Sequence, residues 1–309
     1  MSLYCDPRGR CAIRGADHDR PWVEFWSARR LPYDNKRQSE KWLVAELGCR
    51  LRHLAEQEDG ADIRWLRAVF SSDDPLNCDA GNLTYLNVGT RPFVGLGYRI
   101  SFERWYDVPD EPCPIHWDTG HRYYHRYFFA SSAEPDRWRR GKTLAMWERV
   151  PCRTLTNEQA ARYVWLAMRQ HPELIAINRG PDIAPEVYGI SIRVGSSNPR
   201  LPAPAGILEA VVDGCLASFH RDLDIAHATQ VADKLAAQLD GTGEQELLEG
   251  LTGSGPVLFT GPPFRRHPTF VQLSPCDERC MLGSLEVAHD GDHPRLALSG
   301  EIFALNQST

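Results

Sequence analysis

The feature that most constrains the fold of this chain is a similarity between its two halves. Residues 194–219 resemble residues 69–89 when the segments are aligned without gaps at an offset of 125, and eight of the 21 aligned positions are then identical. The identical pairs are Val69 and Val194, Ser71 and Ser196, Ser72 and Ser197, Leu76 and Leu201, Ala80 and Ala205, Gly81 and Gly206, Leu83 and Leu208, and Gly89 and Gly214. We therefore predict that one α/β unit occurs twice in this chain.

A second alignment, at an offset of 121, pairs the elements that come earlier in each half. It matches Trp26 with Trp147, Asn35 with Thr156, Gln38 with Gln159 and Leu47 with Met168. A residue such as Asn or Thr with Gln three positions later has the form of a capping box at a helix start. Apolar residues follow both pairs at helical spacing, so we expect helices over residues 36–57 and 156–170.

Segments in which apolar and polar residues alternate predict strands on both sides of these helices. The predicted strands are residues 22–27, 64–70, 94–105, 121–130, 143–150, 280–288 and 295–304. The last two are expected to form a hairpin, because Asp-Gly turn chemistry separates them.

The fold class predicted from this order is α/β (α+β), with two tandem related β-α-β-β-β units whose mixed sheets pack together and are covered by helices. The first unit spans residues 1–142 and includes an N-terminal arm and a His/Arg-rich connection. The second spans residues 143–309 and carries a helical insert at 222–255, whose Gly/Glu-rich end we expect to be mobile.

Composition limits the class of protein. The 309 residues are 42% hydrophobic and 25% charged, which is typical of a globular protein. The net charge is −6, so binding to nucleic acid would need a local basic patch. The chain shows no apolar signal segment and no run of about 18 apolar residues. Its nine scattered cysteines suggest reduced thiols, and we expect a cytoplasmic protein with no membrane partner.

The densest group of metal-ligating residue types lies between residues 112 and 127. In an extended segment, His116 and Asp118 point to the same side about 6.6 Å apart, so they could share a divalent metal, with Cys113 as a third ligand. His121 and His125 would lie about 13 Å apart on a strand and could not share an ion. The alternative interpretation is a surface loop followed by a strand that carries Tyr and His.

A second set of residues has zinc-finger-like spacing near the C-terminus. Its members are Cys276, Cys280, His289 and His293. Two cysteines followed by two histidines could hold a structural zinc ion. The same residues also fit the expected hairpin, whose turn would then contain both histidines.

Basic and aromatic residues interleave after this first group. They are Arg122, Arg126, Arg137, Trp138, Arg139, Arg140 and Lys142. Guanidinium groups grip phosphate while rings stack on bases, so the pattern predicts a ligand-binding surface for nucleic acid or a nucleotide. A solvated charged face is the alternative.

The segment PAPAGILEAVVDG at residues 202–214 resembles Holliday-junction resolvases of the RusA type, which place an Asp-rich turn ahead of a helix with a further aspartate. This chain keeps Asp213 on the helix but has Ala203, Ala205 and Gly206 at the turn. No catalytic residue is carried over, and a related fold would imply a dead site in the second copy.

These patterns lead to two hypotheses for function. The first is an intracellular protein that binds or processes a phosphate-containing ligand. As a hydrolase, it would be a metal-dependent phosphodiesterase or nuclease in which His116 and Asp118 hold the metal that activates water. The second is a non-catalytic scaffold or adaptor subunit of a larger assembly, with protein partners. That hypothesis predicts a large exposed apolar patch and no cleft with convergent ionisable groups.

Overall fold

The structure is a computed structural model that carries side chains. It describes residues 3–6, 8–31, 38–57, 64–74, 79–117, 120–178, 186–198, 200–253, 255–275, 277–291 and 296–307. Within this part of the chain, no helix combines the length and apolar character needed to cross a bilayer.

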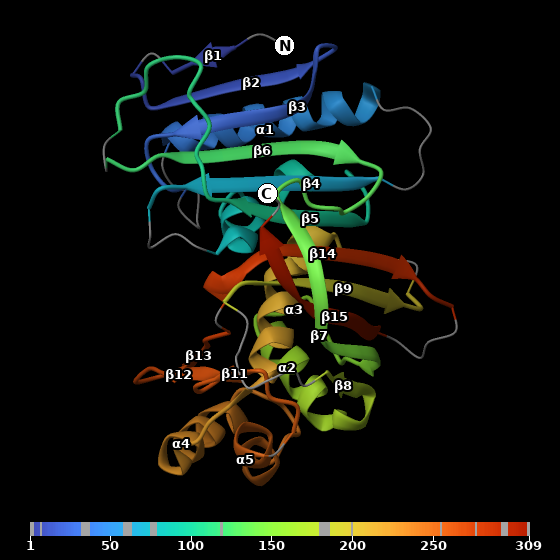
Figure 1. Cartoon of the computed structure of the whole chain (residues 1–309). Coiled ribbons are helices and arrows are strands. Elements are labelled where there is room, and N and C mark those ends of the chain that lie inside the picture. The colour runs from blue at the N-terminus through green and yellow to red at the C-terminus, as the bar shows by residue number, and fades with distance from the viewer. Residues whose placement is uncertain are drawn as a thin grey trace.

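The mixed α/β class is confirmed, and both halves contribute to one eleven-stranded sheet rather than to two packed sheets (Figure 1). The strands of the first half are β1 (Tyr4–Cys5), β2 (Cys11–Asp17), β3 (Arg20–Ser27), β4 (Trp65–Ser72), β5 (Arg99–Trp105) and β6 (Tyr123–Ala130). Those of the second half are β7 (Trp138–Pro151), β8 (Ile175–Ile177), β9 (Tyr188–Ser196), β14 (Cys280–His289) and β15 (Leu296–Gln307). The sheet is continuous because β5 pairs antiparallel with β14.

The strand order is mirrored about this β5–β14 pair. Moving outward, the first half runs β5, β4, β6, β3 and the second runs β14, β9, β15, β7. In each half the inner two strands are parallel and the next two pairings are antiparallel. The two halves therefore share one connectivity. The predicted hairpin of residues 280–288 with 295–304 is wrong, because β9 lies between β14 and β15.

The residue-by-residue alignment does not survive in the strands. Val69 lies in a cluster on the face of the sheet that the helices leave uncovered, whereas Val194 lies in the main core under the helices. Likewise, Trp26 lies in the cluster on the uncovered face, whereas Trp147 lies in the main core. Since a slip of one residue moves a side chain to the other face, both offsets misplace the strands even though the element order agrees.

The helices of the main body are α1 (Gln38–Gln57), η1 (Asn82–Leu86), η2 (Arg91–Phe93), α2 (Ala160–Gln170), η3 (Pro172–Leu174), α3 (Pro204–Ser218) and η4 (Asp277–Arg279). The predicted capping box of Thr156 and Gln159 is wrong, because Gln159 is itself the residue before α2 and makes no capping side-chain bond. Asn35, of the other predicted box, lies outside the described residues. The predicted strand 94–105 begins only at Arg99.

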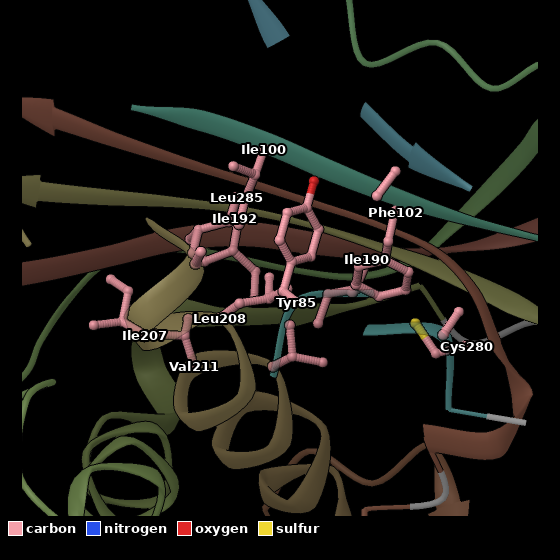
Figure 2. Close-up of a cluster of buried hydrophobic side chains, with 14 of the residues drawn as sticks. Tyr85, Ile100, Phe102, Ile190, Ile192, Ile207, Leu208, Val211, Cys280 and Leu285 are labelled. Carbon is pink, nitrogen blue, oxygen red and sulfur yellow. The ribbon is translucent and has the colours of Figure 1, made fainter. Parts of the chain in front are cut away.

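The main core runs beneath both halves, and its centre lies where α3 and η1 meet β5 and β14 (Figure 2). There the hydroxyl of the buried Tyr85 donates to the carbonyl oxygens of Leu66 and Ser101, each at 2.9 Å. These carbonyls belong to the neighbouring parallel strands β4 and β5. Burial of each large apolar side chain in this cluster contributes about 1.5–3 kcal/mol, so the core stabilises the junction of the halves.

The insert of the second half forms helices. It contains α4 (Ile225–Ala236) and α5 (Glu244–Thr252), is preceded by β10 (His220–Arg221), and is followed by β11 (Phe259–Thr260), β12 (Phe264–Arg266) and β13 (Val271–Leu273). Leu247 and Leu251 of α5 are buried in a second core with Trp165. The segment expected to be a linker therefore folds, because α5 has an apolar side to bury.

Candidate functional site

The predicted metal ligands are not assembled among the described residues. Cys113 forms a disulfide with Cys5, so its sulfur is not free to bind a metal, and the expectation of reduced thiols does not hold for this pair. His116 is exposed, and its backbone N–H donates to the carbonyl of Gly9 at 2.6 Å. Asp118 lies outside the described residues, so its pairing with His116 stays a prediction.

The predicted zinc ligands are also separated. Cys280 begins β14 and His289 ends it, which places them about 30 Å apart along an extended strand. The buried Cys280 thiol donates to the carbonyl of Leu282. Cys276 and His293 lie outside the described residues. Cys280 and His289 therefore cannot ligate one ion.

Most arginines of the predicted phosphate surface are already engaged. The Arg122 side chain donates to Asp73 at 3.0 Å, and Arg140 pairs with Glu301. Arg137 donates to Asp107 at 3.1 Å. A guanidinium that is neutralised in this way has fewer donors left for phosphate.

Aromatic contacts account for the rest of this surface. Arg126 lies 4.6 Å from the ring centre of Trp22. Trp138 is buried and its indole N–H donates to the carbonyl of Arg104 at 2.9 Å, so its ring is not available for stacking on a base. Arg139 and Lys142 remain exposed on β7 without a carboxylate partner in the described part of the chain.

A buried ion pair fixes the connection between the halves against the uncovered face of the sheet. Glu103 lies 3.2 Å from Arg67 and accepts backbone N–H bonds from Asp136 at 3.0 Å and Arg137 at 2.8 Å. Burial raises the pKa of Glu103, and these bonds oppose that rise. The connection between the halves therefore ends at residue 137, and β7 begins at Trp138.

His125 lies on β6 and His121 just before it, in agreement with the predicted strand 121–130, and the two side chains do not converge. His125 is buried, with its ring stacked 4.4 Å from that of Phe25 and edge-on to Phe70 at 5.1 Å. Burial lowers the pKa of His125 to about 3, so this histidine is a neutral core residue.

Four carboxyl groups meet at the junction of the halves. Asp79 precedes η1 in the first half, Glu209 and Asp213 lie on α3, and Asp277 begins η4 just before β14. All four are half-buried, and α3 packs against η1. In the described part of the chain, none of the four forms an ion pair with a basic side chain.

The crowding of these acids changes their ionisation. The carboxyl groups of Asp277 and Asp79 share a hydrogen bond, and Asp79 also accepts from the backbone N–H of Asn82 at 3.0 Å and from the Asn82 side chain. Burial, with repulsion from Asp277, raises the pKa of Glu209 to about 7. Burial and the other three acids raise the pKa of Asp213, and burial and Asp79 raise that of Asp277. Such perturbed groups in one cluster mark a candidate site.

This acidic junction was not selected from the sequence. Two of its members, Glu209 and Asp213, are one helical turn apart on a helix that is otherwise strongly apolar, and this signal could have been found. Asp79 and Asp277 come from distant segments, which only the fold brings together. Among the described residues, no three His, Cys, Asp or Glu side chains are placed to hold a metal ion.

Comparison with known proteins gives no family for the chain. No protein-family model, no curated protein and no solved structure matches it.

Proposed function

We propose that this chain is a non-catalytic binding protein, an adaptor that recognises a basic segment of a partner protein through its acidic junction. The observation that carries the proposal is an imbalance of charge. The arginines expected to grip phosphate are mostly neutralised inside the chain, whereas the four junction carboxyls have no basic partner in the described part of the chain. A lysine or arginine of a partner would relieve their mutual repulsion.

The proposed adaptor differs from the one expected from the sequence, which would bind its partners through a large exposed apolar patch. Among the described residues, the exposed large hydrophobic side chains come from separate segments, and the ionisable groups converge. We therefore assign recognition to charge, with the net charge of −6 favouring encounter with a basic partner.

We also propose that the halves descend from one duplicated unit related by a pseudo-two-fold axis between β5 and β14. The mirrored strand order supports this relationship, and the acidic junction would then lie beside that axis. A cytoplasmic location remains part of the proposal. In a reducing cytosol, Cys5 and Cys113 would be thiols, which alkylation of freshly lysed cells followed by mass spectrometry would show.

The test is a calorimetric titration of the whole chain with a short lysine-rich peptide, an acidic peptide of equal length and a single-stranded oligonucleotide. We expect only the lysine-rich peptide to bind, with affinity falling about tenfold or more between about 0.1 M and 1 M salt. Glu209→Gln should weaken binding, whereas Glu244→Gln, the same charge change on exposed α5, should not. Binding of the oligonucleotide alone, lost in Arg139→Ala/Lys142→Ala, would instead support the phosphate-ligand hypothesis.

A further inference from the structure

A connecting segment crosses the face of the sheet that the helices leave uncovered. Residues 106–117, which we call the strap, run from the end of β5 to the turn between β1 and β2 at the edge of the sheet (Figure 1). The strand that follows, β6, is antiparallel to β5 and only β4 lies between them, so a direct connection would be shorter. The strap therefore extends further across the sheet than the connection requires.

The strap covers an aromatic cluster on this face. Trp26, Trp105 and Tyr124 are buried in the cluster, and the strap contributes Val108 and Ile115 to it. Because no helix packs on this face, removal of the strap would expose these rings to water. An exposed patch of this kind is unfavourable in an isolated chain and typical of an interaction surface.

The two halves of the strap are held in different ways. In the first half, the Ser71 hydroxyl donates to the carbonyl of Asp107 at 2.7 Å, and the Trp26 indole N–H donates to the carbonyl of Pro109 at 3.0 Å. Both donors belong to strands of the sheet.

The second half of the strap, residues 110–117, is joined to the N-terminal arm instead. The backbone N–H of His116 donates to the carbonyl of Gly9 at 2.6 Å, and Cys113 forms the disulfide with Cys5. This bond connects residues 108 positions apart. It is the covalent link that keeps the second half of the strap at the edge of the sheet.

The two cysteines are placed where a small thiol can approach. Both are half-buried, so the bond is not enclosed in a core. Four other cysteines are free thiols, namely Cys49, Cys152, Cys215 and Cys280. One accessible disulfide in a chain that keeps other thiols free is typical of a reversible pair rather than of a disulfide framework.

We propose that the Cys5–Cys113 disulfide is a redox latch for the strap. The thiolate of a small thiol such as glutathione attacks one sulfur, which forms a mixed disulfide and releases the other cysteine as a thiolate. A second thiol then displaces the first as its disulfide, so two electrons pass to the cysteines, and the protons of the two small thiols leave Cys5 and Cys113 as thiols. Residues 110–117 then leave the sheet and uncover Trp26 and Tyr124.

The latch is independent of the proposed partner binding. The acidic junction is built from α3, η1 and η4 on the side of the helices, whereas the strap lies on the uncovered face. Either function could therefore fail without the other. In the proposed cytoplasmic location, the open strap would be the resting form, and an oxidant such as glutathione disulfide would close it.

The test is hydrogen–deuterium exchange of the whole chain, either oxidised with glutathione disulfide or reduced with dithiothreitol. We expect residues 110–117 to exchange about tenfold or more faster in the reduced chain, with no change at 204–218 on α3. Cys113→Ser should exchange rapidly in both conditions. Cys49→Ser, which removes an exposed thiol outside the disulfide, should behave like the native chain.

The comparison of the two redox states uses the native chain, so it does not depend on how Cys113→Ser folds. Equal exchange of residues 110–117 in the two states would overturn the inference. Faster exchange throughout the reduced chain would also overturn it, because the bond would then stabilise the whole fold rather than one segment. Mass spectrometry of the oxidised chain should find a peptide linked through Cys5 and Cys113, and its absence would contradict the latch.

Discussion

The carboxyl groups of Asp277 and Asp79 share a hydrogen bond, and this contact links the second half of the chain to the first. One proton has to be present on the pair for the bond to exist. Glu209 and Asp213 add further charge from α3, so the contact between the halves depends on protonation.

Stability should therefore fall as the pH rises from about 4.5 to 7. Glu209 titrates at about 7 in the folded chain and near 4.5 when unfolded, so the folded state holds a proton that the unfolded state has lost. A raised carboxyl pKa gives stability at low pH that disappears as pH climbs through the folded value, at up to about 1.4 kcal/mol per pH unit for each proton. Urea denaturation at several pH values should show this slope. It should be shallower in Glu209→Gln and unchanged in Glu244→Gln, and a flat profile in the native chain would contradict the account.

His125 should produce the opposite slope at lower pH. Its folded pKa of about 3 lies below the ordinary value of 6.5, so the unfolded state takes up a proton first and stability is lost as the pH falls from about 6.5 to 3. His125→Phe should remove this acid sensitivity while keeping or raising stability at pH 7, because its ring replaces an imidazole packed among Phe25 and Phe70. A half-buried histidine on α1, His53, is the site for a control substitution, His53→Phe. Acid sensitivity that persists in His125→Phe would show that other groups control it.

Arg169 should be essential to the order of the insert. Its side chain donates to the carbonyls of Ser218, Gly250, Gly253 and Pro256, and burial lowers its pKa to about 10. Arg169→Ala leaves these acceptors without their donor and should cost about 2–5 kcal/mol. Limited proteolysis should then cut within residues 240–256. The exposed Arg153, which donates to one carbonyl, serves as control, and Arg153→Ala should change stability by less than about 1 kcal/mol.

Glu103→Gln tests whether the ion pair of Glu103 with Arg67 stabilises the connection between the halves. The substitution removes the buried carboxylate beside Arg67, leaves the exposed Asp136, at 3.1 Å, as its remaining carboxylate partner, and should cost about 2–4 kcal/mol. Glu301→Gln, which affects the more exposed pair with Arg140, should cost about 1 kcal/mol or less. Thermal or urea unfolding measures both, and equal losses in the two variants would argue against a special role for Glu103.

The spacing of apolar residues predicted most of the helices and strands, because this spacing follows directly from which side chains of an element are buried. The strands near Trp26, Val69 and Tyr127 and the helix of Leu47 follow their predicted segments closely. Pairing was harder to predict. The sequence suggests a hairpin at Asp290 and Gly291, yet β9 separates the two strands, since pairing is decided by contacts far apart in the chain.

The candidate site was the least predictable part. Residue types alone suggested that Cys113 and the nearby arginines were functional, whereas the fold uses Cys113 in a disulfide and Arg137 in an internal ion pair. Asp79 and Asp277 are 198 positions apart, which is 277 minus 79, and no local pattern connects them. A site assembled from both halves becomes visible only once the sheet joins them.

The most direct test of the proposed function is hydrogen–deuterium exchange of the whole chain with and without the lysine-rich peptide. The account predicts slower exchange at residues 79–86, 204–218 and 277–280, which surround the acidic junction, and no change at 138–142 on β7. Protection of 138–142 by an oligonucleotide, with none at the junction when the peptide is added, would contradict it.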